Sequence, residues 1–261
     1  MCPNCRAFVT TDDKVCPYCG VQLGARAVER RSPKDLLGGL IPQAHFTTFV
    51  ILLINVGLFA ATELGGQYLV MAGAKSPQAI LYGHQWYRLI TAGFFHGGFM
   101  HIFFNSWALL SVGSEVENVY GTARFIVFYF VANVCGFLAS LYWTPAPSIG
   151  ASAALFGLIG VMVALGTLAK SSMGDAIRSH YLQWAGYGLI MAFVMPGIDN
   201  AAHVGGFIGG FCAAWLAGMP GRILPSWRDN LWRGLAVACL IITLLAFAQM
   251  FQVYFYMQRV A

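Results

Sequence analysis

Long apolar runs dominate this chain and restrict the folds it can adopt. Between charged or Pro/Gly-rich breaks there are seven of them, at about residues 46–62, 97–114, 121–143, 151–169, 179–195, 200–218 and 232–257. A bilayer core about 30 Å thick needs roughly 20 apolar residues for each helix that crosses it. With 58% hydrophobic and 10% charged residues, the chain is also far more apolar than soluble domains usually are. The sequence therefore predicts an all-α, polytopic membrane protein.

The spacing of the apolar runs predicts the domain organisation. The first six crowd together, whereas the seventh follows a polar segment, residues 219–230, that contains two prolines, two arginines and one aspartate. We expect a core of six helices over residues 46–218 and one appended transmembrane helix within residues 219–261. A small N-terminal knuckle at residues 1–24 and a basic linker at residues 25–45 precede them.

Basic residues indicate the orientation, because cytoplasmic loops of membrane proteins are enriched in Lys and Arg. If the N-terminus is cytoplasmic, twelve of the 15 Lys and Arg residues fall inside, and only Lys75, Arg88 and Arg259 fall outside. We expect a multi-pass protein of a prokaryotic inner membrane, with a cytoplasmic N-terminus and an external loop at about residues 63–96. The net charge of +5 is not gathered into a basic, aromatic-interleaved stripe, which argues against a nucleic-acid partner.

Two CxxC pairs stand at the N-terminus. Cys2 and Cys5 are separated by ten residues from Cys16 and Cys19, and at this spacing four thiolates can surround one tetrahedral zinc ion. A segment this short has no other means of folding by itself. We predict one structural Zn²⁺ bound by the four cysteines, in a zinc-ribbon knuckle that contacts a cytoplasmic protein partner. The alternative is a flexible, cysteine-rich tail.

Polar residues inside apolar helices are costly and therefore mark function. Ser152 follows a Pro/Gly-broken stretch, residues 143–151, and opens a run that spans only about 27 Å as a helix before Lys170. It should start below the outer surface, where non-helical backbone is tolerated only beside a water-filled cavity. Free amides at the helix start would stabilise an oxyanion. On this segment alone, a serine that only caps its helix is the stronger interpretation.

His203 offers the base that such a serine needs. A hydroxyl is a poor nucleophile until a neighbouring group takes its proton, which imidazole does at neutral pH. Gly206 and Gly210 lie three and seven residues further along the same helix face, and such small residues let two transmembrane backbones touch. We therefore expect a hydrogen bond between Ser152 and His203. The alternative is a histidine that is merely satisfied inside the bundle.

A third polar group lies on the second apolar run. His101 and Asn105 are four residues apart and share one helix face, whereas His96 falls off that face. No glutamate lies near them, as HExxH zinc chemistry would require, and no aspartate pair lies in any apolar run. A His101 ring nitrogen and the Asn105 amide fit better as oxyanion donors. The hydroxyls of Ser111 and Ser140 can bond back to their own helices.

Four dispersed motifs can now be compared with known families. They are Trp86-Tyr87-Arg88, the run from His96 through His101 to Asn105, Gly150-Ala151-Ser152-Ala153, and Ala202-His203-Val204-Gly205-Gly206. In this order they resemble the rhomboid family of intramembrane serine proteases, over about residues 46–218.

The resemblance implies a set of roles for these residues. Ser152 would be the nucleophile and His203 its general base, with no aspartate completing a triad. His101, Asn105 and the Ser152 amide would form the oxyanion hole, and Arg88 and, less directly, Trp86 would organise the external loop. The implied activity is hydrolysis of peptide bonds in transmembrane protein substrates within the lipid bilayer, without a cofactor for catalysis.

The chain departs from the family pattern at two positions. Ala153 stands where a glycine usually follows the nucleophile, and Phe156 stands where an aromatic residue, often Tyr, stacks on the histidine. Neither change removes a reacting group. A methyl group at Ala153 would tighten the approach of substrate or of a neighbouring helix.

Two rival functions remain open. The first is a catalytically silent rhomboid-like protein that binds transmembrane helices and recruits a partner through the zinc knuckle. Such relatives characteristically lose the serine or the histidine, and this chain has both. The second is a transporter or channel, which the lack of an intramembrane carboxylate and of an inverted repeat of broken helices disfavours.

Overall fold

The chain divides into two compact units, Met1–Gln43 and Ala44–Ala261. The structure, a computed structural model, describes residues 15–16, 19–22, 46–194, 197–220 and 226–260. In the first unit, Val15 and Gln22 form an antiparallel bridge. The turn between them is closed by two backbone hydrogen bonds, from the Cys16 amide to the Val21 carbonyl and from the Gly20 amide to the Cys16 carbonyl, each 2.9 Å long.

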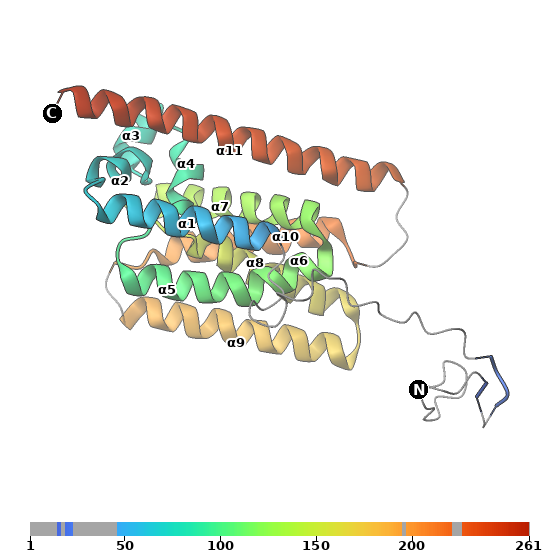
Figure 1. The fold of residues 1–261 in the computed structure, drawn as a ribbon. Helices are drawn as coiled ribbons and strands as arrows, with labels where there is room; N and C mark the ends of the chain where they lie inside the picture. Colours follow the sequence, from blue (N-terminus) through green and yellow to red (C-terminus); the bar gives the residue numbers. More distant parts are fainter. Residues whose placement is uncertain (1–14, 17–18, 23–45, 195–196, 221–225, 261) are drawn as a thin grey trace. The chain divides into compact units, whose positions relative to one another are not determined.

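Helices build the second unit (Figure 1). They are α1 (Phe46–Glu63), α2 (Gln67–Gly73), α3 (Pro77–Leu81), α4 (Arg88–Thr91), the 3-10 turn η2 (Ala92–Phe94), α5 (Phe99–Ala108), the π-helical turn η3 (Leu109–Gly113), α6 (Ser114–Tyr120), α7 (Thr122–Trp143), α8 (Ser152–Ala169), α9 (Ser172–Val194), α10 (Asn200–Ala217) and α11 (Ser226–Val260). Each of the seven predicted runs coincides with one or more of these helices. Among the described residues, α1, α7, α8 and α11 are long and apolar enough to cross a membrane by length and composition.

Three helices extend beyond the predicted runs into polar sequence. The second run continues through η3 into α6, α9 begins at Ser172, and α11 begins at Ser226. The first turns of α9 and α11 carry Asp175 and Asp229, and an acidic side chain at this position interacts favourably with the helix dipole. Hydropathy detects only the apolar part of a helix, so it misses these polar turns.

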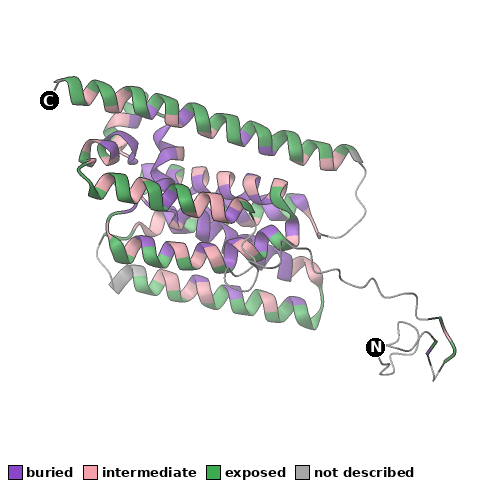
Figure 2. Ribbon diagram, viewed as in Figure 1, coloured by how far each residue is buried: buried purple, intermediate pink, exposed green. Residues whose placement is uncertain are grey.

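α8 is the central helix of the unit. It packs against α7, α9 and α10, and 78% of it is buried inside the unit. Figure 2 shows the buried residues gathered on the central helices, whereas α11 is exposed along most of its length. A helix that is apolar on every face, as α8 is, requires such an enclosed position or lipid around it.

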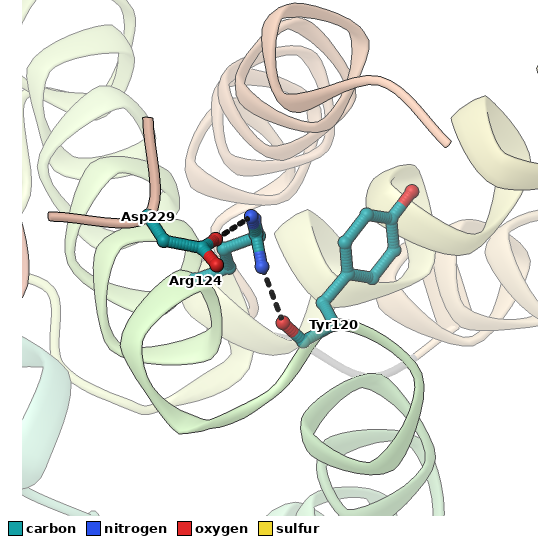
Figure 3. A network of polar contacts seen from close by, with 3 residues as sticks. All are labelled: Tyr120, Arg124 and Asp229. Atoms are coloured by element: carbon teal, nitrogen blue, oxygen red, sulfur yellow. Dashed lines mark hydrogen bonds and ion pairs between the residues drawn. The ribbon is translucent and has the colours of Figure 1, made fainter. Parts of the chain in front are cut away.

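α11 lies along the side of the unit that α7 and the short helices α2 and α4 form (Figure 1). Met250 is buried there in a cluster with Leu69 of α2. At the other end of α11, the Arg124 guanidinium donates to the Asp229 carboxylate at 2.7 Å and to the Tyr120 carbonyl at 3.4 Å (Figure 3). Because Asp229 is half exposed, this ion pair contributes at most about 1 kcal/mol, and apolar contacts dominate the packing of α11.

The segment between α1 and α5 is a compact set of short helices joined by Arg88. This side chain is buried, and its Nη1 donates to the Met71 carbonyl at 2.8 Å and to the Ala74 carbonyl at 2.7 Å. Asn133 of α7 then donates through Nδ2 to the carbonyls of Leu89 and Ile90, at 3.0 and 3.1 Å. Arg88 thus helps to fix the segment internally, and Asn133 helps to attach it to α7.

Candidate active site

Ser152 is the first residue of α8, directly after a segment that is not helical. Gly150 in this segment has a φ of +133°, which a residue with a side chain rarely adopts. The Gly150 amide donates to the Ala92 carbonyl at 3.0 Å. The first amides of a helix have no intrahelical partner. Because Ser152 begins α8, its side chain lies beside backbone amides that are free to donate.

His203 lies in the first turn of α10, and its ring meets the Ser152 side chain. The Ser152 Oγ atom is 2.9 Å from His203 Nε2, a hydrogen-bonding distance. Phe156, one turn along α8, stacks on the imidazole, with 4.1 Å between ring centroids and 11° between planes. His203 is buried, whereas Ser152 is only half-buried. The imidazole is therefore confined by packing, and the hydroxyl stays accessible.

Close contact between α8 and α10 brings the two side chains together. A Cβ atom built at Gly206 would lie 2.0 Å from the Ala153 carbonyl oxygen, and one built at Gly210 would lie 2.0 Å from the Gly157 carbonyl oxygen. One built at Gly160 of α8 would lie 2.3 Å from the Phe207 carbonyl oxygen. The two backbones are in contact along these glycines, so any larger side chain would separate the helices.

No carboxylate of the described residues makes a hydrogen bond to His203. Among the described residues, the buried His203 Nδ1 atom has no hydrogen-bond partner. Asp199 lies one turn earlier, but its carboxylate accepts instead from Ser140, from the Thr144 hydroxyl at 2.8 Å and from the Ala202 amide at 3.1 Å. Burial alone would raise the pKa of Asp199, but these hydrogen bonds outweigh it and lower the pKa. The nearby Asp199 carboxylate is thus held by other donors, and a catalytic dyad of Ser152 and His203 stays a prediction.

His101 faces the same point from α5. Its Nδ1 atom accepts a hydrogen bond from the Gly97 amide at 3.3 Å, so the neutral ring carries its proton on Nε2. A Cβ atom built at Gly150 would lie 2.7 Å from His101 Nε2 and 3.6 Å from Ser152 Oγ. His101 Nε2 and Ser152 Oγ therefore both lie on the side of Gly150 where a Cβ atom would stand.

Asn105 and His96 lie beside His101. The buried Asn105 donates one Nδ2 hydrogen to the His101 carbonyl at 2.8 Å, which leaves its second amide hydrogen. His96, in the turn before α5, is buried with its ring edge-to-face against His101, 5.1 Å between centroids. In the segment between α1 and α5, Arg88 is buried and bonded to carbonyls as described above, whereas Trp86 is exposed.

Two charged residues near the site were not singled out from the sequence. Asp199 caps α10, and Lys75 is fully buried, with its ammonium group donating to the carbonyls of Thr144 and Ala146. Burial lowers the pKa of Lys75, and the nearby Asp199 partly offsets this effect. Ser140, expected to bond back to its own helix, donates to Asp199 instead. An aspartate directly before an apolar run is a helix-capping signal, and it was available in the sequence.

The described cysteines of the N-terminal pairs fit part of a zinc knuckle. Cys16 is buried and Cys19 is exposed, and the Gly20 amide donates to the Cys16 carbonyl at 2.9 Å. A tetrahedral zinc site would need both thiolates together with two further ligands. Cys2 and Cys5, the predicted remaining ligands, lie outside the described residues. Within the described residues alone, no three His, Cys, Asp or Glu side chains form a metal-binding group.

Comparisons with known proteins match both units. Residues 83–220 match the rhomboid domain and residues 1–23 match a zinc-ribbon domain. Rhomboid protease GluP of Bacillus subtilis (strain 168) is 35% identical over 178 residues, which cover 66% of this chain and 35% of that protein. Rhomboid-like protease 1 of Toxoplasma gondii is 30% identical over 227 residues, 84% of this chain and 76% of that protein. Inactive RHOMBOID-like protein 8 of Arabidopsis thaliana is 37% identical over 142 residues, 52% of this chain and 39% of that protein.

These matches agree with the helices of the second unit. The predicted all-α, polytopic membrane fold is confirmed, as is a zinc-ribbon segment at the N-terminus. The number of helices that cross the membrane, the domain boundaries and the roles of the site residues stay predictions. The chain spans about a third of the length of the Bacillus subtilis relative.

Proposed function

Because the chain belongs to the rhomboid family, we propose that it is an intramembrane serine endopeptidase. It hydrolyses peptide bonds in or near the transmembrane segments of other membrane proteins. One observation carries the proposal: the 2.9 Å distance between Ser152 Oγ and His203 Nε2, in a bundle whose central helix is otherwise apolar. A hydroxyl next to an imidazole has the proton acceptor that it needs to act as a nucleophile.

The first half of the reaction forms an acyl-enzyme. Ser152 Oγ attacks the substrate carbonyl carbon while His203 Nε2 takes its proton. The resulting oxyanion accepts hydrogen bonds from the Ser152 amide, His101 Nε2 and the second Nδ2 hydrogen of Asn105. Such donors act mainly on the transition state, and losing one typically costs about 100- to 1,000-fold in rate. The peptide C–N bond then breaks, and His203 returns the proton to the leaving amine.

The second half releases the acyl group. His203 Nε2 removes a proton from a water molecule as that water attacks the acyl carbon, and the same oxyanion donors stabilise the new intermediate. Collapse restores the Ser152 hydroxyl, which regains the proton from His203. No metal or organic cofactor takes part in these steps. Since His203 Nδ1 has no hydrogen-bond partner among the described residues, we assign the orientation of the ring to the stacked Phe156.

For the N-terminal unit we propose one structural zinc ion bound by Cys2, Cys5, Cys16 and Cys19. The support is the zinc-ribbon match at residues 1–23 and the closed turn between Cys16 and Gly20. Its function is contact with a cytoplasmic protein partner, which requires the N-terminus to face the cytoplasm of a prokaryotic cell. A protein tag at the N-terminus, protected from protease in sealed right-side-out vesicles, tests this orientation.

The proposal is tested with the purified full chain and a transmembrane peptide whose helix is destabilised. The wild type should cleave the peptide, and Ser152→Ala should abolish cleavage while leaving the melting temperature within a few degrees. The rival is a catalytically silent protein that binds transmembrane helices, and one relative is named as inactive. Peptide binding without cleavage by the wild type would favour that rival.

A further inference from the structure

Lys75 is a fully buried lysine to which the proposed reaction assigns no role. It lies between α2 and α3, and its Nζ donates to the Thr144 carbonyl at 2.8 Å and to the Ala146 carbonyl at 2.7 Å. Its backbone pairs with Ser148 through two hydrogen bonds of 3.0 Å. One residue thus makes four hydrogen bonds to residues 144–148, the segment that leads into Ser152.

Asp199 binds the same segment from α10. Its carboxylate accepts from the Thr144 hydroxyl at 2.8 Å, and from the Ala202 amide at 3.1 Å in the turn that carries His203. Thr144 therefore has a cation on its carbonyl and an anion on its hydroxyl. The attraction between Lys75 and Asp199 acts across this one residue. Lys75 thus joins the segment between α1 and α5 to residues 144–148, which lead into Ser152. Asp199 joins residues 144–148 to α10, which carries His203.

A buried ammonium group is costly unless carbonyls and an opposite charge surround it. A lysine that served only as a charged residue of an external loop would be exposed to water. Here the ammonium group, which has three donors, is buried and donates to the carbonyls of Thr144 and Ala146. The arrangement is best explained by the need to fix the loop before the serine in one conformation.

We propose that Lys75 is a positioning residue for the dyad, acting with Asp199 through Thr144 to set the position of Ser152 relative to His203. The inference rests on the proposed function, because positioning matters only if Ser152 reacts. A displacement of about 1 Å between reacting groups typically costs about 100-fold in rate. Loss of the lysine should therefore affect chemistry more than substrate binding.

The test compares Lys75→Met with Lys170→Met in the full chain. Lys170 directly follows α8 at its other end, so the second variant is a control for loss of a lysine. Two rates are measured: labelling of Ser152 by a fluorophosphonate per folded molecule, and cleavage of a transmembrane peptide. Lys75→Met should lower the labelling rate and kcat by about 10- to 100-fold with KM changed less than about threefold. Lys170→Met should match the wild type.

Two further variants separate positioning from folding. Asp199→Asn should slow labelling in the same way, and the double variant should lose less than the product of the two single losses, since both act on one segment. If Lys75→Met does not fold, Thr144→Val serves instead, because it keeps both carbonyls and removes only the bond to Asp199. Its labelling rate should fall by about 3- to 10-fold.

The outcomes are distinct. A wild-type labelling rate in Lys75→Met would overturn the inference. If Lys75→Met does not fold, a wild-type labelling rate in Thr144→Val would overturn it. A loss that only follows the fraction of folded protein, or losses that multiply in the double variant, would also overturn it. If the wild type itself does not label at Ser152, the proposed function fails instead, independently of Lys75.

Discussion

At the scale of single residues, the site depends on Gly150, a position that has no room for a side chain. Gly150 has a positive φ, and a Cβ atom built there would lie 2.7 Å from His101 Nε2 and 3.6 Å from Ser152 Oγ. The Gly97 amide fixes the His101 tautomer from the opposite side of the ring. Sequence motifs identified Ser152 and His203 as candidates, because a serine and a histidine in apolar helices are rare. The tautomer of His101 depends on a backbone amide, which leaves no signal in the sequence.

Gly150→Ala should remove most of the activity. The added methyl group would lie 2.7 Å from His101 Nε2, and the positive φ would strain the new residue by about 1–3 kcal/mol. We expect labelling of Ser152 by a fluorophosphonate to slow by about 100-fold. Gly57→Ala is the control, because no described atom lies within 4 Å of a Cβ atom built there. An unchanged rate in Gly150→Ala would contradict the proposed oxyanion geometry.

Ala153, where the family pattern has glycine, meets neighbouring helices. It is fully buried, and a Cβ atom built at Gly136 of α7 would lie 2.7 Å from its methyl group. Ala153→Gly should therefore lower stability by about 1 kcal/mol, through loss of packing and of helix propensity. The labelling rate should stay within about twofold of the wild type. A large rise in rate would instead mean that the methyl group obstructs substrate.

At the scale of helices, glycine spacing predicted which surfaces meet but not every helix end. The stripe of His203, Gly206 and Gly210 packs against α8, as small residues allow. The polar first turns of α9 and α11 were missed, because hydropathy does not register a capped polar turn. Lys75 was assigned only to the external side, since its partners are carbonyls present at every residue.

Gly206→Ala should separate α8 from α10. Its Cβ atom would lie 2.0 Å from the Ala153 carbonyl oxygen, so the helices must move apart and the Ser152 to His203 distance must grow. We expect a lower melting temperature and a labelling rate reduced by about 10-fold or more. Gly186→Ala on α9 is the matched control, because no described atom lies within 4 Å of its added Cβ atom. Equal behaviour of the two variants would rule out this contact as the one that aligns the dyad.

At the scale of the whole chain, two units with different requirements are joined. The membrane unit derives its fold from apolar helices around α8, whereas the N-terminal unit contains the zinc-ribbon match, and we propose that a bound metal stabilises its fold. Composition and cysteine spacing were enough to predict both units, because each signal is periodic or local. The substrate is not readable from the sequence in the same way.

Purified full chain should contain one zinc ion, and Cys16→Ser with Cys19→Ser should remove it. Metal analysis by mass spectrometry measures this ratio directly. Since the two units are separately compact, zinc removal should leave the labelling rate of Ser152 within about twofold of the untreated protein. Absence of zinc from the purified chain, with all four N-terminal thiols open to alkylation, would contradict the proposed metal site.

The most direct measurement is fluorophosphonate labelling of the purified full chain, with the modified residue mapped by mass spectrometry. The account predicts a single adduct on Ser152 in the wild type, none in Ser152→Ala, and a rate at least about 100-fold lower in His203→Ala. Labelling that survives both substitutions at the wild-type rate would contradict it.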